Sequence, residues 1–137
     1  MALDRKLAVI DLTTGVIEKK VIPLAVRKAF LGGRGLTASL LYKYAKPGCD
    51  PLGPDNVVIF SAGILGGTLA SSPARTDVMC KNPLTNMLGS GNLGGCFAPE
   101  LRWAGFDHIV VKGKAAKPVY LWVHNGEVEI KDAKNLW

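Results

Sequence analysis

Cysteines, histidines and long apolar runs are scarce in this sequence of 137 residues, and each shortage excludes a class of protein. The three cysteines form no Cys-x-x-Cys pair, which argues against a disulfide framework and against a zinc or iron–sulfur site made by cysteines alone. No apolar run approaches the roughly 20 residues that a membrane-spanning helix needs. The N-terminus also lacks secretory, twin-arginine and lipidation signals. We therefore expect a cytoplasmic protein with no membrane partner.

The composition is that of one globular domain with its own hydrophobic core. Apolar residues make up 48% of the sequence and charged residues 20%, which is typical of a globular protein and not of a disordered chain. The net charge of +6 comes from scattered lysines and arginines, without an arginine-rich tract. Such a field suits a phosphorylated cofactor or an acidic electron-transfer protein. We expect no nucleic-acid partner, and a basic nucleotide- or nucleic-acid-binding domain remains the less favoured alternative.

Periodicity and turn signals predict an α+β fold with a mainly antiparallel sheet. A β-hairpin is expected at 7–22, and the Asn125-Gly126 pair predicts a second hairpin at 119–131. Between them we expect helices at 24–31, 35–45 and 98–104, and strands at 57–60, 75–81 and 109–112. The Gly32–Gly35 segment is interpreted as a helix C-cap without a ligand, because it lacks the context of a phosphate loop.

The segment from Ser61 to Asp107 is unusually rich in glycine, with eight glycines between short apolar runs. Glycine amides can approach a ligand closely, and successive amides bind anions. The Gly94-Gly95 pair precedes an expected helix start, which would favour a phosphate there. Glycine content alone favours the alternative, a set of tight turns. Cys96, next to this pair, is interpreted as a buried structural cysteine.

Few side chains in the sequence suggest chemistry. Arg75 follows a small, flexible segment, and its guanidinium suits a phosphate or a carboxylate, although a surface ion pair is the simpler interpretation. Asn92 suits a turn that exposes a backbone carbonyl. Four titratable residues are interpreted as structural because nothing completes a catalytic set around them: Glu100, Asp107, His108 and His124. The three tryptophans, Trp103, Trp122 and Trp137, are expected in the core or at an interface.

Six motifs occur in a familiar order along the chain. They are GGRGL at 32–36, DPLGPDN at 50–56, KNPLTN at 81–86, GNLGG at 91–95, ELRWAGFD at 100–107 and KPVYLWV at 117–123. In this order and spacing the chain resembles the N-terminal domain of the tungsten-dependent aldehyde:ferredoxin oxidoreductases. The resemblance implies a two-sheet domain that forms a base under the cofactor. Residues 1–137 would be a single pterin-binding N-terminal domain, incomplete at its C-terminal end.

The resemblance also implies the ligands of this domain. Tungsten, or molybdenum in its place, would be held by two pterins. Arg75 would lie between the pterins and a [4Fe–4S] cluster, and Asn92 would give its backbone carbonyl to the Mg²⁺ that bridges the pterin phosphates. Gly94, Gly95 and Phe97 would present backbone amides to phosphate. The cysteines that hold the cluster would lie outside this chain.

The implied reaction is the oxidation of a small aldehyde to a carboxylic acid, with electrons passing to ferredoxin. The chain alone would be inactive and would act with the remaining domains or subunits of the enzyme. A homodimer is compatible with this reading. The alternative within the same fold is a stand-alone, non-catalytic subunit or interaction module that docks on a cofactor-bearing partner.

Overall fold

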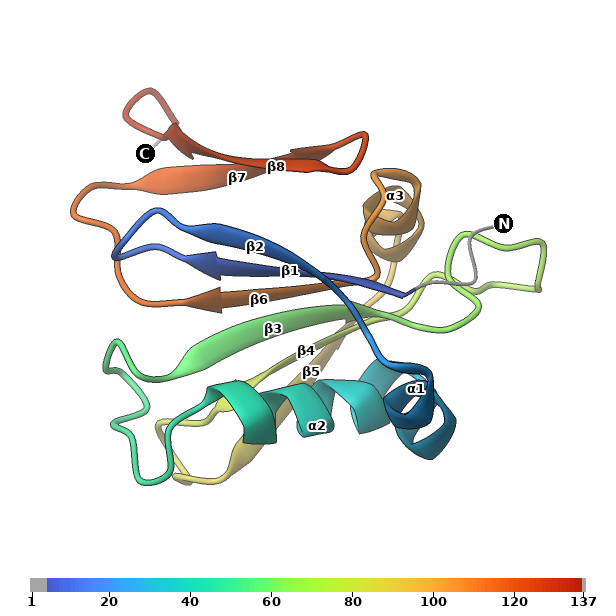
Figure 1. Ribbon diagram of the computed structural model, residues 1–137, viewed down its shortest axis with the longest axis horizontal. Helices are drawn as coiled ribbons and strands as arrows, with labels where there is room; N and C mark the ends of the chain where they lie inside the picture. The colour runs from blue at the N-terminus through green and yellow to red at the C-terminus, as the bar shows by residue number, and fades with distance from the viewer. Residues whose placement is uncertain (1–4, 137) are drawn as a thin grey trace.

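A six-stranded sheet forms the centre of the molecule (Figure 1). The computed structural model describes residues 5–136, so Trp137 lies outside the described residues. The elements are β1 (Lys6–Asp11), β2 (Ile17–Val21), α1 (Leu24–Phe30), α2 (Gly33–Tyr44), β3 (Val57–Ala62), β4 (Thr76–Lys81), β5 (Leu88–Leu93), α3 (Phe97–Trp103), β6 (His108–Lys112), β7 (Val119–His124) and β8 (Glu127–Asp132).

The strand order of the large sheet is β2-β1-β6-β3-β4-β5, and β7 and β8 form a second sheet of two strands. Every pairing in the described part is antiparallel except the one between β1 and β6. The α+β class and its mainly antiparallel, two-sheet form are therefore confirmed. The parallel pair joins strands that are about a hundred residues apart in sequence, so it could not be predicted from local patterns.

The large sheet buries a hydrophobic core on each face. On one face, α2 contributes Leu36 and Leu40, one helical turn apart, which pack with Val9 and Ile59 of the sheet. On the other face, α3 and the β7–β8 hairpin cover β1 and β6, with Phe106 at the centre. Figure 1 shows these layers, with α2 below the sheet and the β7–β8 hairpin above it. The central strands therefore bury apolar side chains on both faces, and this burial stabilises the sheet.

The strand β5 lies where the glycine content favoured tight turns and where no strand was expected. Glycine is depleted in strands because it has no side chain to pack. Here all six residues of Leu88–Leu93 pair with β4, and β5 is an edge strand whose residues are mostly exposed. β5 is therefore stabilised mainly by its backbone hydrogen bonds to β4, because its glycines contribute no side-chain packing.

The Gly32–Gly35 segment was predicted as the C-cap of a helix, but it also contains the start of the next helix. α1 ends at Phe30, and α2 starts at Gly33 with Gly32 as its N-cap residue. A Cβ on Gly32 would lie 2.2 Å from the Ile64 side chain, so glycine is required by this close approach. Helix α2 thus begins two residues earlier than the predicted range.

Candidate functional site

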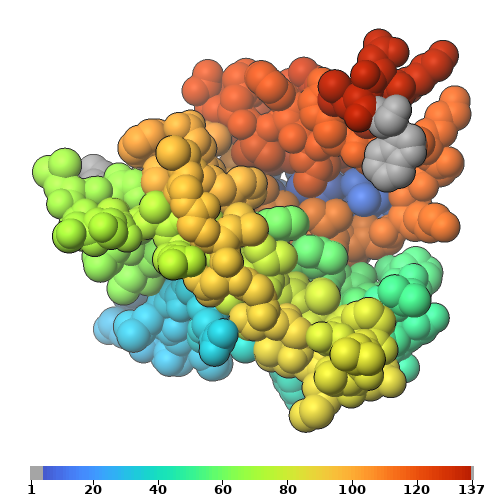
Figure 2. All heavy atoms as spheres, turned by 180° about the vertical axis from the view of Figure 1, so that it is seen from behind, coloured from blue at the N-terminus to red at the C-terminus, as the bar shows by residue number. Residues whose placement is uncertain are grey.

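The predicted ligand-binding residues lie near one end of the β4–β5 pair. Arg75 immediately precedes β4, and Asn92 is in β5, which is antiparallel to β4. Gly94 and Gly95 connect β5 to α3, and Phe97 is the first residue of α3. Because the start of β4 adjoins the end of β5, residues far apart in sequence come together. In Figure 2, the yellow and orange residues of β5 and α3 run across the surface without another element over them.

Arg75 is exposed and lies against the Gly94 backbone. A Cβ on Gly94 would be 3.7 Å from Nη1 of Arg75. The Gly63 N–H donates to the Arg75 carbonyl at 3.0 Å, which fixes the main chain at the start of β4. Within residues 5–136, the guanidinium has no hydrogen-bond or ion-pair partner, so the surface ion pair that was the simpler interpretation does not form. Its five N–H donors remain available to an anion.

The backbone of Asn92 faces the open edge of the sheet. At the β4–β5 turn, the Asn82 N–H donates to the Met87 carbonyl at 2.8 Å. Hydrogen-bonded and non-hydrogen-bonded pairs alternate along an antiparallel ladder. Asn82 and Met87 are thus a hydrogen-bonded pair, and Asp77 and Asn92 lie five register positions further along. Because five is odd, Asp77 and Asn92 form a non-hydrogen-bonded pair. The N–H and C=O of Asn92 therefore point away from β4, and in the described part no strand pairs with β5 on that side.

The residues after β5 leave the backbone accessible. A Cβ on Gly95, whose φ is +88°, would meet nothing within 4 Å. Helix α3 has seven residues and no side-chain cap, and Pro99 in its first turn has no N–H to offer. The Phe97 ring packs on Phe60 with 5.9 Å between ring centroids, which anchors the helix start to the sheet. Cys96 is exposed, so the prediction of a buried cysteine was wrong.

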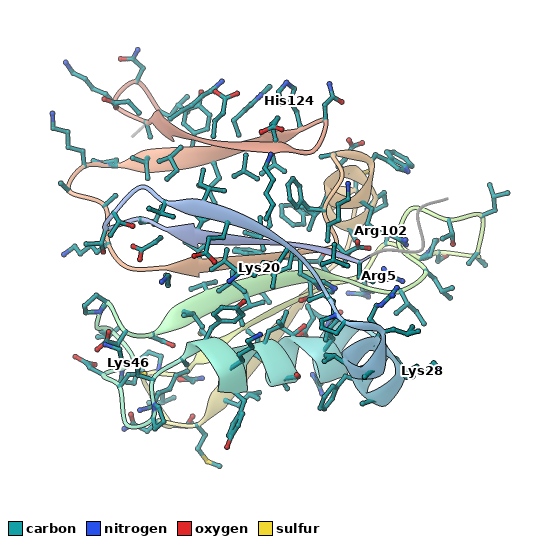
Figure 3. All side chains as sticks on the ribbon, viewed as in Figure 1. Arg5, Lys20, Lys28, Lys46, Arg102 and His124 are labelled. Carbon is teal, nitrogen blue, oxygen red and sulfur yellow. The ribbon has the colours of Figure 1, made fainter. Side chains whose placement is uncertain are left out.

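A buried ion-pair cluster holds the loop that leads to Arg75. Asp107 Oδ1 lies 2.6 Å from Arg5 Nη1 and 3.1 Å from Arg102 Nε, and Figure 3 shows the two arginines side by side. Both arginines also donate to the Ile64 carbonyl at 3.0 Å, and Arg102 donates to the Gly66 carbonyl. The cluster thus ties the 63–75 loop to β1 and α3. Sequence reasoning gave Asp107 no partner, because Arg5 is 102 positions away.

His108 lies next to this cluster and is fully buried. Burial lowers the pKa of His108 to about 4; the Asp107 charge opposes this shift, and Arg5 and Arg102 add to it. Neither ring nitrogen has a partner in the described part. The imidazole is therefore neutral at physiological pH, which agrees with its interpretation as a structural residue.

The residues present fit phosphate and a hard cation better than they fit an iron–sulfur cluster. An exposed arginine, free backbone groups and an open carbonyl are suited to phosphate and Mg²⁺. The cysteines lie apart, with Cys49 buried and Cys80 half-buried. No group of three or more His, Cys, Asp or Glu residues able to hold a metal occurs within residues 5–136.

An apolar groove adjoins the site. Between α3 and β7 lies a cavity of about 500 Å³, lined among others by Phe97, Trp103 and Trp122. Trp103 and Trp122 are exposed, which places both at the surface rather than in the core. Among the described helices, none is long and apolar enough to cross a membrane.

Comparison with known proteins gives one consistent family. Residues 7–137 match the family described as aldehyde ferredoxin oxidoreductase, N-terminal domain. The tungsten-containing aldehyde ferredoxin oxidoreductase of Pyrococcus furiosus is 44% identical over 128 residues, which are 93% of this chain and 21% of that protein. The corresponding protein of Thermococcus kodakarensis is 42% identical over the same shares.

Two further relatives are named for different functions. The aliphatic sulfonate oxidoreductase WOR-like subunit of Pyrococcus furiosus is 36% identical over 99% of this chain and 22% of its own length. The solved active-site complex BamBC of benzoyl coenzyme A reductase, with 1,5-dienoyl-CoA, has a TM-score of 0.92 and 39% identity, over 96% of this chain and 20% of its own. The chain thus spans about a fifth of the length of the relatives it matches.

Proposed function

The chain belongs to the family of aldehyde ferredoxin oxidoreductase N-terminal domains, and on this premise we propose that it forms the pterin-binding base of a tungsten-dependent oxidoreductase. The observation that carries the proposal is the exposed Arg75 guanidinium, which has no partner within residues 5–136, beside the Gly94 backbone and the open edge of β5. An anion there would meet a fixed positive charge together with free backbone N–H groups.

Each residue of the site has its own role in this proposal. Arg75 would pair with the pterin phosphates and supply a positive charge near the redox centres. The Asn92 carbonyl would be a ligand of Mg²⁺, which needs few protein ligands of this kind. Gly94, Gly95 and Phe97 offer backbone amides to phosphate. When bound, the bis-pterin tungsten or molybdenum centre supplies the redox chemistry, and the protein supplies orientation and electrostatics.

The reaction that we propose for the whole enzyme is oxidation of an aldehyde to a carboxylic acid, with ferredoxin as electron acceptor. The Pyrococcus furiosus and Thermococcus kodakarensis relatives are named as aldehyde ferredoxin oxidoreductases, which supports this reaction. The relatives also include oxidoreductases named for a sulfonate, for glyceraldehyde-3-phosphate and for a coenzyme A thioester. The base domain is therefore compatible with several substrates, and the cluster ligands and the catalytic acid–base groups belong to other domains or subunits.

The exposed apolar residues favour contact with those other domains or subunits. Leu93, Phe97 and Trp103 are exposed on β5 and α3, beside the proposed cofactor site. Contiguous apolar surface of this kind marks an interface. The same observation supports the alternative of a non-catalytic subunit that docks on a cofactor-bearing partner.

Two measurements test the proposal. Metal analysis for tungsten, molybdenum and magnesium, with pterin fluorescence, on protein purified anaerobically should find pterin together with one of the two heavy metals. Titration of the protein with Mg²⁺ and inorganic pyrophosphate, followed by NMR, should perturb residues 92–97.

The Arg75→Ala variant should bind pyrophosphate about tenfold more weakly, because a charge-assisted hydrogen bond contributes roughly 1.5–3 kcal/mol. Lys114→Ala is the control, since Lys114 is exposed and follows the far end of β6, and it should bind like the unmodified protein. Equal affinities of the Arg75 variant and the unmodified protein would remove Arg75 from the site.

A further inference from the structure

A buried carboxylate lies on β4 opposite Asn92, the residue proposed to bind the cation. Asp77 of β4 is 3% exposed and is the register partner of Asn92. Its Oδ1 accepts a hydrogen bond from Ser90 Oγ at 2.9 Å and a longer one from Asn92 Nδ2 at 3.4 Å. These contacts agree with the backbone alternation, because side chains approach most closely at non-hydrogen-bonded pairs.

Asp77 continues a row of buried polar side chains across the sheet. In register, Ser61 lies beside Asp77, and His108 lies beside Ser61 on the next strand. Ser61 Oγ, Asp77 Oδ2 and both His108 ring nitrogens are shielded and without partners in the described residues. The row ends at Asn92, on the exposed edge strand.

Within residues 5–136 Asp77 forms no ion pair, whereas Asp107, the other buried aspartate, has two arginines. A buried carboxylate without a cationic partner is costly for stability.

We propose that Asp77 is a positioning residue: it accepts hydrogen bonds from Ser90 and Asn92, holds β5 against β4 and so fixes the direction of the Asn92 carbonyl for the cation. The role of that carbonyl rests on the proposed function, whereas the hold on β5 does not. Edge strands pair on one side only, and β5 contains two glycines that contribute no side-chain packing. The two side-chain contacts to Asp77 therefore supply the constraint that the strand itself lacks.

Hydrogen exchange of the metal-free protein tests the hold on β5. The amides of Gly89, Gly91 and Leu93 face β4 by the same alternation, so they report on this pairing. In Asp77→Ala we expect these amides to exchange about tenfold faster, from the loss of two hydrogen bonds. Asp77→Asn keeps an oxygen acceptor and should restore protection. Ser90→Ala, which leaves Asp77 in place, should show a smaller, local increase.

A second buried carboxylate provides the matched control. Asp107→Asn should raise exchange throughout the sheet, because it removes the charge that holds β1, α3 and the 63–75 loop together. Unchanged β5 amides in Asp77→Ala, or an equal increase in all strands, would overturn the proposal. The side-chain amide signal of Asn92 should also shift in Asp77→Ala and return in Asp77→Asn.

Binding of Mg²⁺ with inorganic pyrophosphate separates this inference from the proposed function. Both Asp77 variants lack the charge, so the difference between them isolates the acceptor. We expect Asp77→Ala to bind about fivefold more weakly than Asp77→Asn, which corresponds to the loss of about one ordinary hydrogen bond. Equal affinities would refute positioning of the carbonyl. If the unmodified protein binds no pyrophosphate, the proposed function fails, and the exchange pattern still decides whether Asp77 holds β5.

Discussion

The charge of Asp107 should be one of the largest single contributions to the stability of this fold. Asp107→Asn keeps an oxygen acceptor for the Lys6 N–H, which now donates to Oδ2 at 3.0 Å. It removes the negative charge that lies between Arg5 and Arg102, at 2.6 and 3.1 Å. Two guanidinium groups would then lie close together, largely buried and without a counter-charge.

The size of the effect follows from the burial of the cluster. Breaking a buried ion pair costs roughly 3–5 kcal/mol. The three side chains are 10–17% exposed, so water reaches them in part, and we take the lower end, about 3 kcal/mol. With about 2.1 cal/mol/K of unfolding entropy per residue, this free energy lowers the Tm by roughly 10 °C for a chain of 137 residues.

Urea and thermal unfolding followed by circular dichroism measure this loss directly. The matched control is Asp55→Asn, whose ion pair with Lys46 is largely exposed and should contribute less than about 0.5 kcal/mol. The 63–75 loop should also become more sensitive to proteases, since both arginines hold its carbonyl groups. A loss below about 1 kcal/mol for Asp107→Asn would refute the reasoning, because the cluster would then behave like a surface pair.

Two further stability predictions follow from the described contacts. The pKa of His108 lies at about 4, below its usual 6.5, so the unfolded chain takes up this proton first and stability falls as the pH drops from about 6.5 to 4. His108→Gln should remove up to about 3 kcal/mol of that pH dependence in urea titrations, and an unchanged slope would contradict the burial effect. Gly113→Ala should destabilise more than Gly15→Ala in the same assay. Both glycines have φ of +75°, but only at Gly113 would the Cβ meet Thr13 Oγ1, at 2.4 Å.

The sequence predicted those elements whose signals are local. The strand that begins at Val57 and the hairpin at Asn125-Gly126 were identified from apolar runs and from a turn pair, and both are present. β5 was missed because two glycines in six residues hide a strand whose stability comes from its partner. The start of α2 was misplaced because the close contact of Gly32 with Ile64 is not visible in the sequence.

The ligand-binding residues of the candidate site were predicted, but the buried carboxylates that hold the site in place were not. Arg75 and Asn92 could be named because their motifs resemble a family, and the structure shows that β4 and β5 place them near one end of the sheet. Asp77 was not singled out, and Asp107 was interpreted as structural without a partner, because the contacts with Ser90 and Arg5 join residues that are distant in sequence. Carboxylates of this kind are recognised only when burial and partners are known, since their spacing follows no local period.

The position of β6 has a consequence for the order in which this protein folds. β6 lies between β1 and β3, so the hairpin of β1 and β2 has no partner in the sheet until residue 112 has been synthesised. The β3–β4–β5 unit, in contrast, joins neighbours in sequence and can form while the chain is still emerging. Contacts with large sequence separation slow folding because loop closure precedes their gain in free energy. We therefore expect the N-terminal hairpin to join the sheet only when β6 is available, so that β6 completes the sheet last.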